Sequence, residues 1–330
     1  MTWDLASKLL ALFAMIAIGW FATRRGMLGG AEGQRALAGA AFGIFLPALL
    51  FRTMAALDLS TLPGPLLLAF FGPLVLWALA VWAWERRRAD RPGLADADPG
   101  HPADPAVRSV ALTFGNSVQV GLPFATALFG QAGLQLHLAI VALHALVILS
   151  LITVLAEIDM ARAAARQGAG AALGPMLLGI VRQSLLHPVV LPVLAGMAWR
   201  LTGLGLPPVV DNMLQTLGQA GVPLCLILIG ASLAQHGLAV DPRALLGRVL
   251  LKLLLLPALV AAAGVWLFGL RGLPLSVLVM AAALPIGSNA LLFAQRYRTR
   301  EGEASAVIVV STVLFAFSAP LWLAVLAWLS

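Results

Sequence analysis

Charged residues are scarce in this sequence. Asp, Glu, Lys and Arg make up 11% of its 330 residues, whereas an average soluble domain contains about 25%. Hydrophobic residues make up 61%, which matches the roughly 200 apolar positions that ten membrane spans of about 20 residues require. Membrane spans therefore account for the whole chain, and the composition leaves no room for a separate soluble domain.

Cysteine is nearly absent as well. Cys225 is the only one and lies in an apolar run, so a disulfide framework and a Cys-based metal site are excluded. The sequence also lacks the G-x-S-x-G, H-E-x-x-H and P-loop patterns of enzymes and ATP-driven pumps. We therefore expect a protein that is not an enzyme and uses no cofactor or metal. A membrane sensor would need a soluble output domain, which the composition does not provide.

The apolar residues group into ten predicted spans. These are 4–22, 35–56, 64–85, 107–129, 133–157, 176–200, 209–234, 244–269, 274–295 and 305–328. The odd-numbered connections contain 15 Lys and Arg residues and the even-numbered ones 3. Because basic connections stay in the cytoplasm, this bias predicts a multi-pass protein of the cytoplasmic membrane with both termini outside. The pI of 11.1 then reflects topology, and we expect no nucleic-acid partner.

Three features recur in the same order in the two halves of the chain. Gly19 and Gly196, Pro47 and Pro223, and Asn116 and Asn289 are separated by 177, 176 and 173 residues. Nearly constant offsets favour an internal duplication over chance, and an odd number of spans per copy makes the repeat inverted. We expect a first repeat over 1–158, a cytoplasmic connector over 159–175 with an interfacial helix at 159–173, and a second repeat over 176–330.

Two predicted spans are interrupted in the middle by glycine, proline and asparagine. The interruptions lie in 111–123 and 283–290. Lipid cannot satisfy the backbone groups that an interruption exposes, so such breaks occur where they are buried in protein or line a cavity. A matched pair, one in each half, is the sequence pattern that best indicates a transporter's substrate site.

The predicted spans contain almost no acid, because Asp4 and Glu157 are at the membrane edges. A sodium/proton antiporter would require an intramembrane carboxylate, so cation transport is disfavoured. Helix N-termini at the breaks attract anions, and neutral amides can donate to a carboxylate. The predicted substrate site comprises Asn116, Ser117, Gln119, Pro123, Pro285, Gly287, Ser288 and Asn289, with Gly115 as a secondary member. The alternative is that the two asparagines only satisfy frayed backbone groups.

Four further residues are secondary candidates. His137 and His144 are seven residues apart and share a helical face, where they could relay protons, although interhelical hydrogen bonding is the favoured interpretation. Lys252 is close to the cytoplasmic end of span 8 and is expected to snorkel to the headgroups, with a place in an anion vestibule as the alternative. Pro47 lies in span 2.

Several short motifs together resemble the auxin efflux carrier family, which contains plant auxin carriers and bacterial permeases for malonate and malate. The motifs are Gly19 to Gly26, Phe45-Leu46-Pro47-Ala48, Asn116 to Pro123, His187-Pro188, Val222-Pro223-Leu224, Gly230-Ala231-Ser232-Leu233, Leu284-Pro285-Ile286-Gly287 and Phe293-Ala294-Gln295-Arg296-Tyr297. Plant members have proline at the position of Gly115 and lack the Ser288-Asn289 pair. These departures favour a small bacterial acid over auxin.

The resemblance implies an all-α fold of ten transmembrane helices, similar to sodium/bile-acid symporters and sodium/proton antiporters. Spans 1, 2, 6 and 7 would form a scaffold, and spans 3–5 and 8–10 a core with two crossed broken helices. We expect elevator-type transport of small mono- or dicarboxylates, with a sodium-coupled bile-acid-type symporter as the alternative. The expected partners are the carboxylate and the lipid bilayer, while proton coupling and a homodimer are left open.

Overall fold

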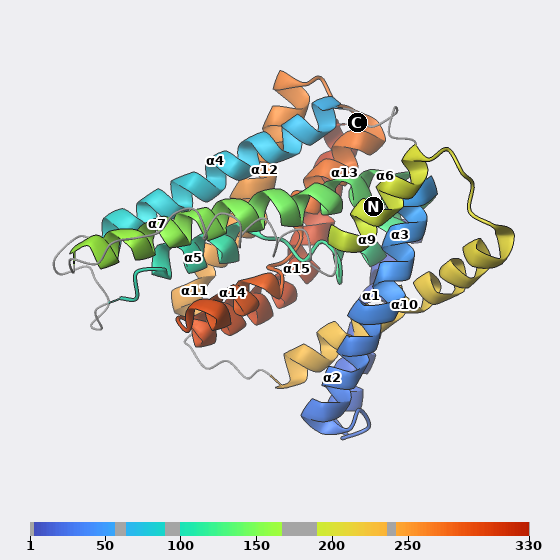
Figure 1. Cartoon of the computed structure of the whole chain (residues 1–330), viewed down its shortest axis with the longest axis horizontal. Coiled ribbons are helices and arrows are strands. Elements are labelled where there is room, and N and C mark those ends of the chain that lie inside the picture. The colour runs from blue at the N-terminus through green and yellow to red at the C-terminus, as the bar shows by residue number, and fades with distance from the viewer. Residues whose placement is uncertain (1–2, 57–63, 90–99, 167–189, 236–241, 330) are drawn as a thin grey trace.

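The computed structural model describes residues 3–56, 64–89, 100–166, 190–235 and 242–329, and every element named in them is helical (Figure 1). Six helices in these residues are long and apolar enough to cross a membrane, and two shorter apolar helices span Phe13–Arg24 and Gly272–Ala283. The six are Glu32–Ala56, Gly64–Ala89, Gly121–Ala164, Pro208–Ala231, Leu245–Leu267 and Glu301–Leu329. The protein is therefore a multi-pass membrane protein, and the number of ten spans stays a prediction.

One group of helices occupies the right side of Figure 1. It contains α1 (Trp3–Arg24), α2 (Gly30–Ala40), a π-helical turn η1 (Ala41–Phe45), α3 (Leu46–Ala56), α9 (Val190–Leu201) and α10 (Pro208–Gln235). Helix α1 packs along α10, and α3 packs on both α9 and α10. These helices correspond to spans 1, 2, 6 and 7, which the resemblance assigns to the scaffold.

Glycines allow these helices to approach until their backbones touch. A Cβ atom on Gly19 of α1 would lie 2.1 Å from the carbonyl oxygen of Ile227 in α10, and one on Gly230 would lie 1.9 Å from that of Ile16. Gly196 of α9 has the same role, since its Cβ would lie 2.5 Å from the Phe51 oxygen of α3. Small residues at contacts between membrane helices permit this close packing.

The second group of helices surrounds the larger apolar core. It contains α4 (Gly64–Ala89), α5 (Asp104–Thr113), α6 (Gly121–His144), η3 (Ala145–Leu149), α7 (Ser150–Arg166), α11 (Pro242–Leu250), η4 (Leu251–Leu255), α12 (Leu256–Ala262), η5 (Ala263–Leu267), α13 (Gly272–Ala283), α14 (Asn289–Tyr297) and α15 (Glu301–Leu329). Helix α13 packs against α4, α6, α12 and α15. Phe70, Leu278 and Phe315 are fully buried at this centre.

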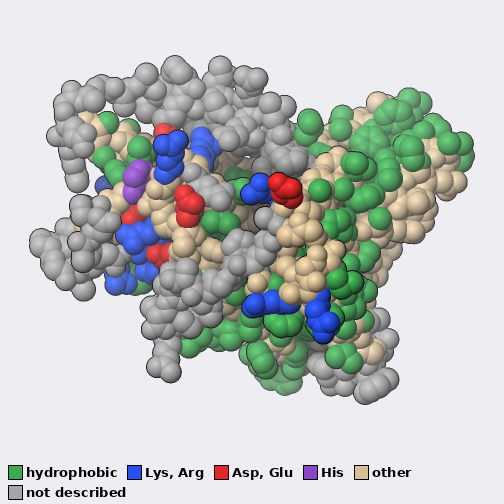
Figure 2. All heavy atoms as spheres, turned by 90° about the horizontal axis from the view of Figure 1, so that it is seen from below, with side chains coloured by type: hydrophobic (Ala, Val, Ile, Leu, Met, Phe, Trp, Pro, Cys, Tyr) green, Lys and Arg blue, Asp and Glu red, His purple; other side chains and the backbone are tan. Residues whose placement is uncertain are grey.

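Charged side chains are unevenly distributed over the face that Figure 2 shows. Lys, Arg, Asp and Glu side chains are visible at the left, the centre and the lower middle, whereas the right end shows many hydrophobic side chains and no charged ones. Arginines at the ends of α1 and α4 lie over aromatic rings, as Arg24 does over Trp20 at 5.4 Å and Arg88 over Trp84 at 4.9 Å. Amphipathic aromatic rings and snorkelling cations favour the membrane–water interface, so these helix ends fit that position.

Helix α7 extends beyond the predicted end of span 5. Residues 159–166, predicted to begin a separate connector, continue α7 to Arg166, and 167–175 lie outside the described residues. Asp159 joins the extension to α4, because Trp82 of α4 donates to it at 2.7 Å and Arg86 lies 3.7 Å away. The described ends of the loop predicted at 86–106 also differ, since 86–89 end α4 and 104–106 begin α5. The His187-Pro188 motif lies outside the described residues.

Candidate functional site

The two helix breaks, at residues 114–120 and 284–288, lie directly against each other. The Asn116 backbone N–H donates to the Pro285 carbonyl at 2.7 Å, and the Gly287 N–H donates to the Phe114 carbonyl at 2.9 Å. Gly115 and Ile286 thereby form an isolated antiparallel bridge. Each break supplies hydrogen-bond partners that lipid could not give the other.

A side chain at Gly287 would crowd this contact. A Cβ atom there would lie 3.0 Å from the Gly115 carbonyl oxygen, so the backbone of the first break would have to shift by a few tenths of an ångström. Gly115 has more room, because its Cβ would lie 3.5 Å from the nearest atom, in Leu284. The Ile286 N–H is satisfied by the Ser311 hydroxyl of α15 at 3.0 Å.

Side chains from neighbouring helices satisfy carbonyls at the C-terminal ends of α5 and α13. Trp77 of α4 donates from Nε1 to the Leu112 carbonyl at 3.0 Å. Lys252 of η4 donates from Nζ to the Ala282 and Leu284 carbonyls at 2.6 and 2.8 Å. Trp77 and Lys252 are 175 residues apart in the sequence, within the range of offsets found between the two halves.

The prediction that Lys252 snorkels to the headgroups is wrong. Its side chain is fully buried, and its ammonium group is held at the C-terminal end of α13. The negative end of a helix dipole and two free carbonyl oxygens stabilise a cation there. A hydropathy pattern cannot show this, because the partners come from a different span.

Both histidines lie next to the first break, but they contact it in different ways. His137 is buried and its Nε2 lies 2.8 Å from the Ser117 carbonyl, so it ties α6 to the break. Gly121 makes room for it, since a Cβ there would lie 2.4 Å from Nε2. The favoured interpretation of hydrogen bonding is wrong for His144, because neither ring nitrogen has a partner among the described residues. Its ring packs edge-on against Phe114 at 4.5 Å.

A cavity of about 100 Å³ lies beside the crossed breaks. It is lined by residues of the breaks, of α10, of the start of α14 and of α15: Asn116, Gln119, Leu228, Ile229, Leu233, Ser288, Leu291, Ser305, Ile308, Val309 and Thr312. Three of the predicted site residues, Asn116, Gln119 and Ser288, are therefore brought together. None of the described residues that line the cavity carries a charge.

Asn116 and Gln119 are linked by two hydrogen bonds. The Asn116 side-chain oxygen Oδ1 accepts the Gln119 backbone N–H at 3.2 Å, and the Asn116 side-chain nitrogen Nδ2 donates to Gln119 Oε1 at 3.1 Å. Asn116 therefore satisfies a frayed backbone group while it lines the cavity, so both roles considered from the sequence are compatible. An amide carries two N–H hydrogens, which leaves one on Asn116 and two on Gln119 for a ligand.

The other predicted residues do not line this cavity. Ser117 is buried beside His137, Pro123 lies in the first turn of α6, Pro285 and Gly287 form the contact between the breaks, Asn289 begins α14, and Gly115 forms the bridge. Pro47 is the second residue of α3, after the π-helical turn. His137, His144 and Lys252 do not line the cavity either; they contact the breaks or the helix ends next to them, as described above.

The sequence analysis missed the part of the cavity that α15 and α10 supply. Ser305 and Thr312 are seven residues apart in α15, a largely apolar helix, and this spacing places them on one helical face. The same argument was applied to the two histidines and could have found this pair. Leu228, Ile229 and Leu233 of α10 give no signal in the sequence, since they resemble any other lipid-facing or core residues.

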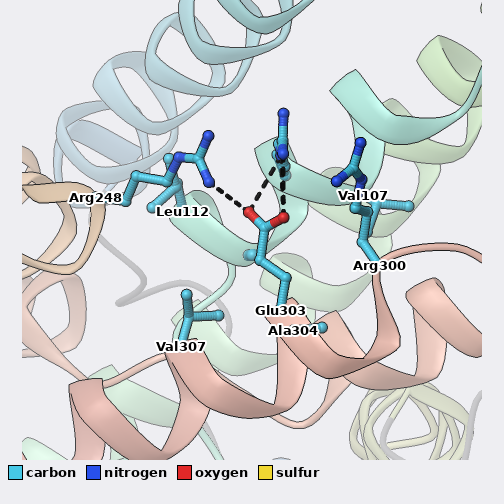
Figure 3. A pocket seen from close by; sticks show the side chains of 9 residues that line it. Val107, Leu112, Arg248, Arg300, Glu303, Ala304 and Val307 are labelled. Atoms are coloured by element: carbon cyan, nitrogen blue, oxygen red, sulfur yellow. Dashed lines mark hydrogen bonds and ion pairs between the residues drawn. The ribbon is translucent and has the colours of Figure 1, made fainter. Parts of the chain in front are cut away.

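A closed ring of ion pairs holds four helices together at one end of the second group. We call Glu85 of α4, Arg108 of α5, Arg248 of α11 and Glu303 of α15 the ion-pair ring. Figure 3 shows the side of this ring at Glu303, with Arg248 next to it. Arg108 lies 3.0 Å from Glu85 and 3.1 Å from Glu303, and Arg248 lies 3.4 Å from Glu85 and also pairs with Glu303. Beside the ring, Arg300 pairs with Asp104 at 2.7 Å.

The ring corrects the expectation that the spans contain almost no acid. Glu85 is the last residue of the predicted span 64–85, and its side chain is 1% exposed. Three arginines follow it directly, so it resembled part of a solvated charged connection. It lies at a helix end and is paired with two arginines, so it is not a free carboxylate at the membrane midplane.

Two interrupted helices that cross beside a cavity, inside a bundle of membrane-length helices, define a membrane transporter. Residues 5–323 match the family model described as membrane transport protein. The chain therefore belongs to this family, that of the auxin efflux carriers.

Three curated relatives show where the similarity lies. The chain is 30% identical over 141 residues to a putative malonate transporter of Rhizobium meliloti, covering 42% of this chain and 43% of that protein. It is 27% identical over 323 residues to an uncharacterized transporter of Methanothermobacter thermautotrophicus, covering 96% and 97%. It is 26% identical over 145 residues to auxin efflux carrier component 3a of Oryza sativa subsp. japonica, covering 42% and 23%.

Proposed function

We propose that this transporter carries small organic anions, mono- or dicarboxylates, across the cytoplasmic membrane. The observation that carries the proposal is the cavity of about 100 Å³ at the crossed breaks, with amide and hydroxyl groups and no charged side chain among the described residues that line it. The relative named a putative malonate transporter supports an organic acid as the cargo.

The electrostatics of the breaks favour an anion. Helices α6 and α14 begin at Gly121 and Asn289, immediately after Gln119 and Ser288 have contributed to the cavity. The positive ends of these two helix dipoles stabilise a carboxylate. Behind the breaks lies the buried Lys252 amino group, bonded to the carbonyls of residues 282 and 284.

The position of the cavity supports an elevator mechanism. Its α10 wall belongs to the helices assigned to the scaffold, and the break and α15 walls belong to those assigned to the core. Sliding of the core past α10 would carry a bound anion from one side of the membrane to the other. The Trp77 and Lys252 contacts support the inverted repeat, because span 3 and span 8 each supply one donor to the following broken span.

Two observations disfavour the alternative of a sodium-coupled bile-acid-type symporter. Pockets for drug-sized ligands measure about 300–1,000 Å³, well above the cavity of about 100 Å³. In addition, the Lys252 amino group already donates to the carbonyl oxygens of Ala282 and Leu284, so these two oxygens are not available as sodium ligands.

We therefore expect uptake that does not require sodium. The purified protein in liposomes should take up radiolabelled mono- or dicarboxylates equally well with sodium or choline as the cation, with uptake compared in the presence and absence of a pH gradient. Empty liposomes control for diffusion of the neutral acids. A steep, saturable dependence on sodium would contradict the assignment of Lys252, and an absence of protein-dependent uptake would contradict the proposed cargo.

The charge distribution predicts that residues 86–106 face the cytoplasm and that both termini face outward. A single cysteine at position 96, in a Cys225→Ala background, should react with an impermeant maleimide only after the cells are opened. The matched control is Gly205→Cys, at an exposed position between α9 and α10 with no atom near its added Cβ, which should react in intact cells. The reverse pattern would overturn the topology.

A further inference from the structure

We propose that the cavity selects monocarboxylates with a short aliphatic chain over dicarboxylates. This inference rests on the proposed transport of organic anions and narrows the class of substrate. It follows from three properties of the cavity: the charge of its lining, the division between its polar and apolar walls, and its size.

The lining provides no cation for a second carboxylate. A buried ion must be matched by an opposite charge or by several hydrogen-bond donors, because its transfer out of water is very costly. None of the described lining residues is Lys, Arg or His. Lys252 is not among them and is bonded to two carbonyls, while Arg108 and Arg248 are paired within the ion-pair ring.

Hydrogen-bond donors are concentrated on the side of the breaks. Asn116 and Gln119 retain amide hydrogens, and Ser288 lies at the start of α14, so one carboxylate can be bound there. Among the described residues, the wall from α10 contributes Leu228, Ile229 and Leu233. A second carboxylate held against this wall would lose its hydration and gain no donor, whereas methylene and methyl groups would be buried favourably.

The hydroxyls of α15 do not change this division. Thr312 donates its hydroxyl hydrogen to the Ile308 carbonyl at 2.7 Å, which leaves only acceptor capacity toward the cavity. Ser305 is one further donor, beside Ile308 and Val309 on the same helix. One neutral hydroxyl is too little for a second carboxylate, which has about four acceptor sites.

The size of the cavity suits a small acid. One water needs about 10–15 Å³ by the same measure of volume, so about 100 Å³ holds a molecule of several heavy atoms. Within that volume, each additional buried methylene is expected to improve affinity about fourfold. Affinity should therefore rise from acetate to propionate to butyrate.

The test measures binding, since neutral forms of short acids cross liposomes unaided. Acetate, propionate, butyrate, malonate and succinate are titrated into the purified protein in detergent by calorimetry, with thermal stabilisation as a second readout. We expect butyrate to bind at least about tenfold more tightly than malonate, the loss typical of an unmatched charged group. Leu233→Gln, which adds a donor to the α10 wall, should reduce this ratio, whereas Leu233→Met, of similar size and apolar, should retain it.

The possible failures are distinguishable. Malonate or succinate binding more tightly than butyrate would overturn this inference and leave the proposed transport of organic anions standing. An unchanged ratio in a folded Leu233→Gln protein would refute the role of the α10 wall and with it the inference. If none of the five acids binds to the folded protein, the proposed function fails, and this inference fails with it.

Discussion

Replacement of Arg108 by alanine is expected to lower the free energy of unfolding by about 3 kcal/mol, the lower end of the range for removing one partner of a buried ion pair. Arg108 contacts both acids of the ion-pair ring, at 3.0 and 3.1 Å, and lies closer to Glu85 than Arg248 does at 3.4 Å. Its loss leaves two carboxylates to share Arg248, and Glu85 is only 1% exposed. Thermal or chemical unfolding in detergent, followed by circular dichroism, measures the change.

A double variant tests whether the lost stability comes from an unmatched buried charge or from lost packing. Arg108→Met with Glu85→Met removes one acid and one base and leaves the Arg248–Glu303 pair balanced. Hydrophobic replacements of a buried pair are often neutral or stabilising, so this protein should recover most of the stability that Arg108→Ala loses. If the double variant is as unstable as the single one, the argument from charge balance is wrong.

A pair at the periphery provides the matched control. Arg162 lies 3.9 Å from Asp159 on the same helix, and its side chain is 50% exposed. Exposed pairs of this kind contribute about 0–1 kcal/mol. Arg162→Ala should therefore change stability little, and a loss equal to that of Arg108→Ala would show that general charge, not the closed ring, determines the effect.

The positions of the two breaks could be predicted from the sequence because their cause is local. Glycine, proline and asparagine interrupt an apolar run, and the backbone groups they expose need partners within the protein. The breaks at 114–120 and 284–288 lie within the predicted interruptions, and Asn116 and Gln119 line a cavity beside them. These glycine, proline and asparagine residues can be interpreted from their immediate sequence neighbours alone.

The partners of the breaks could not be predicted, because their roles depend on tertiary contacts. Lys252 resembles any lysine close to a span end, and only the C-terminal end of α13 beside it explains its burial. Glu85 resembles part of a charged connection until Arg108 and Arg248 are placed around it. The α10 wall of the cavity shows the same limit of sequence analysis. A leucine that lines a ligand cavity and a leucine that packs on a neighbouring helix look the same in the sequence.

Asn289 shows how far the repeat argument extends. It is the sequence counterpart of Asn116 at an offset of 173 residues, and the inverted repeat predicts equal roles for the two amides. In this structure Asn116 lines the cavity, and the residue before Asn289, Ser288, takes the corresponding place. Asn289→Ala is therefore the natural comparison for Asn116→Ala, and we expect it to weaken binding less.

Asn116→Ala is expected to weaken binding of the carboxylate by about ten- to a hundredfold, the equivalent of about 1.5–3 kcal/mol for one hydrogen bond to a charged group. Asn116→Asp should be worse and is the sharper variant. Aspartate retains an oxygen for the Gln119 backbone N–H, now bonded at 3.2 Å, so the first break keeps this contact. The added negative charge, however, lies beside the bound anion in a cavity with no cation among its described lining residues. Calorimetric titration with the preferred acid measures both losses, and unfolding in detergent checks that each variant is folded. Normal binding by a folded Asn116→Asp protein would exclude this amide from the anion site.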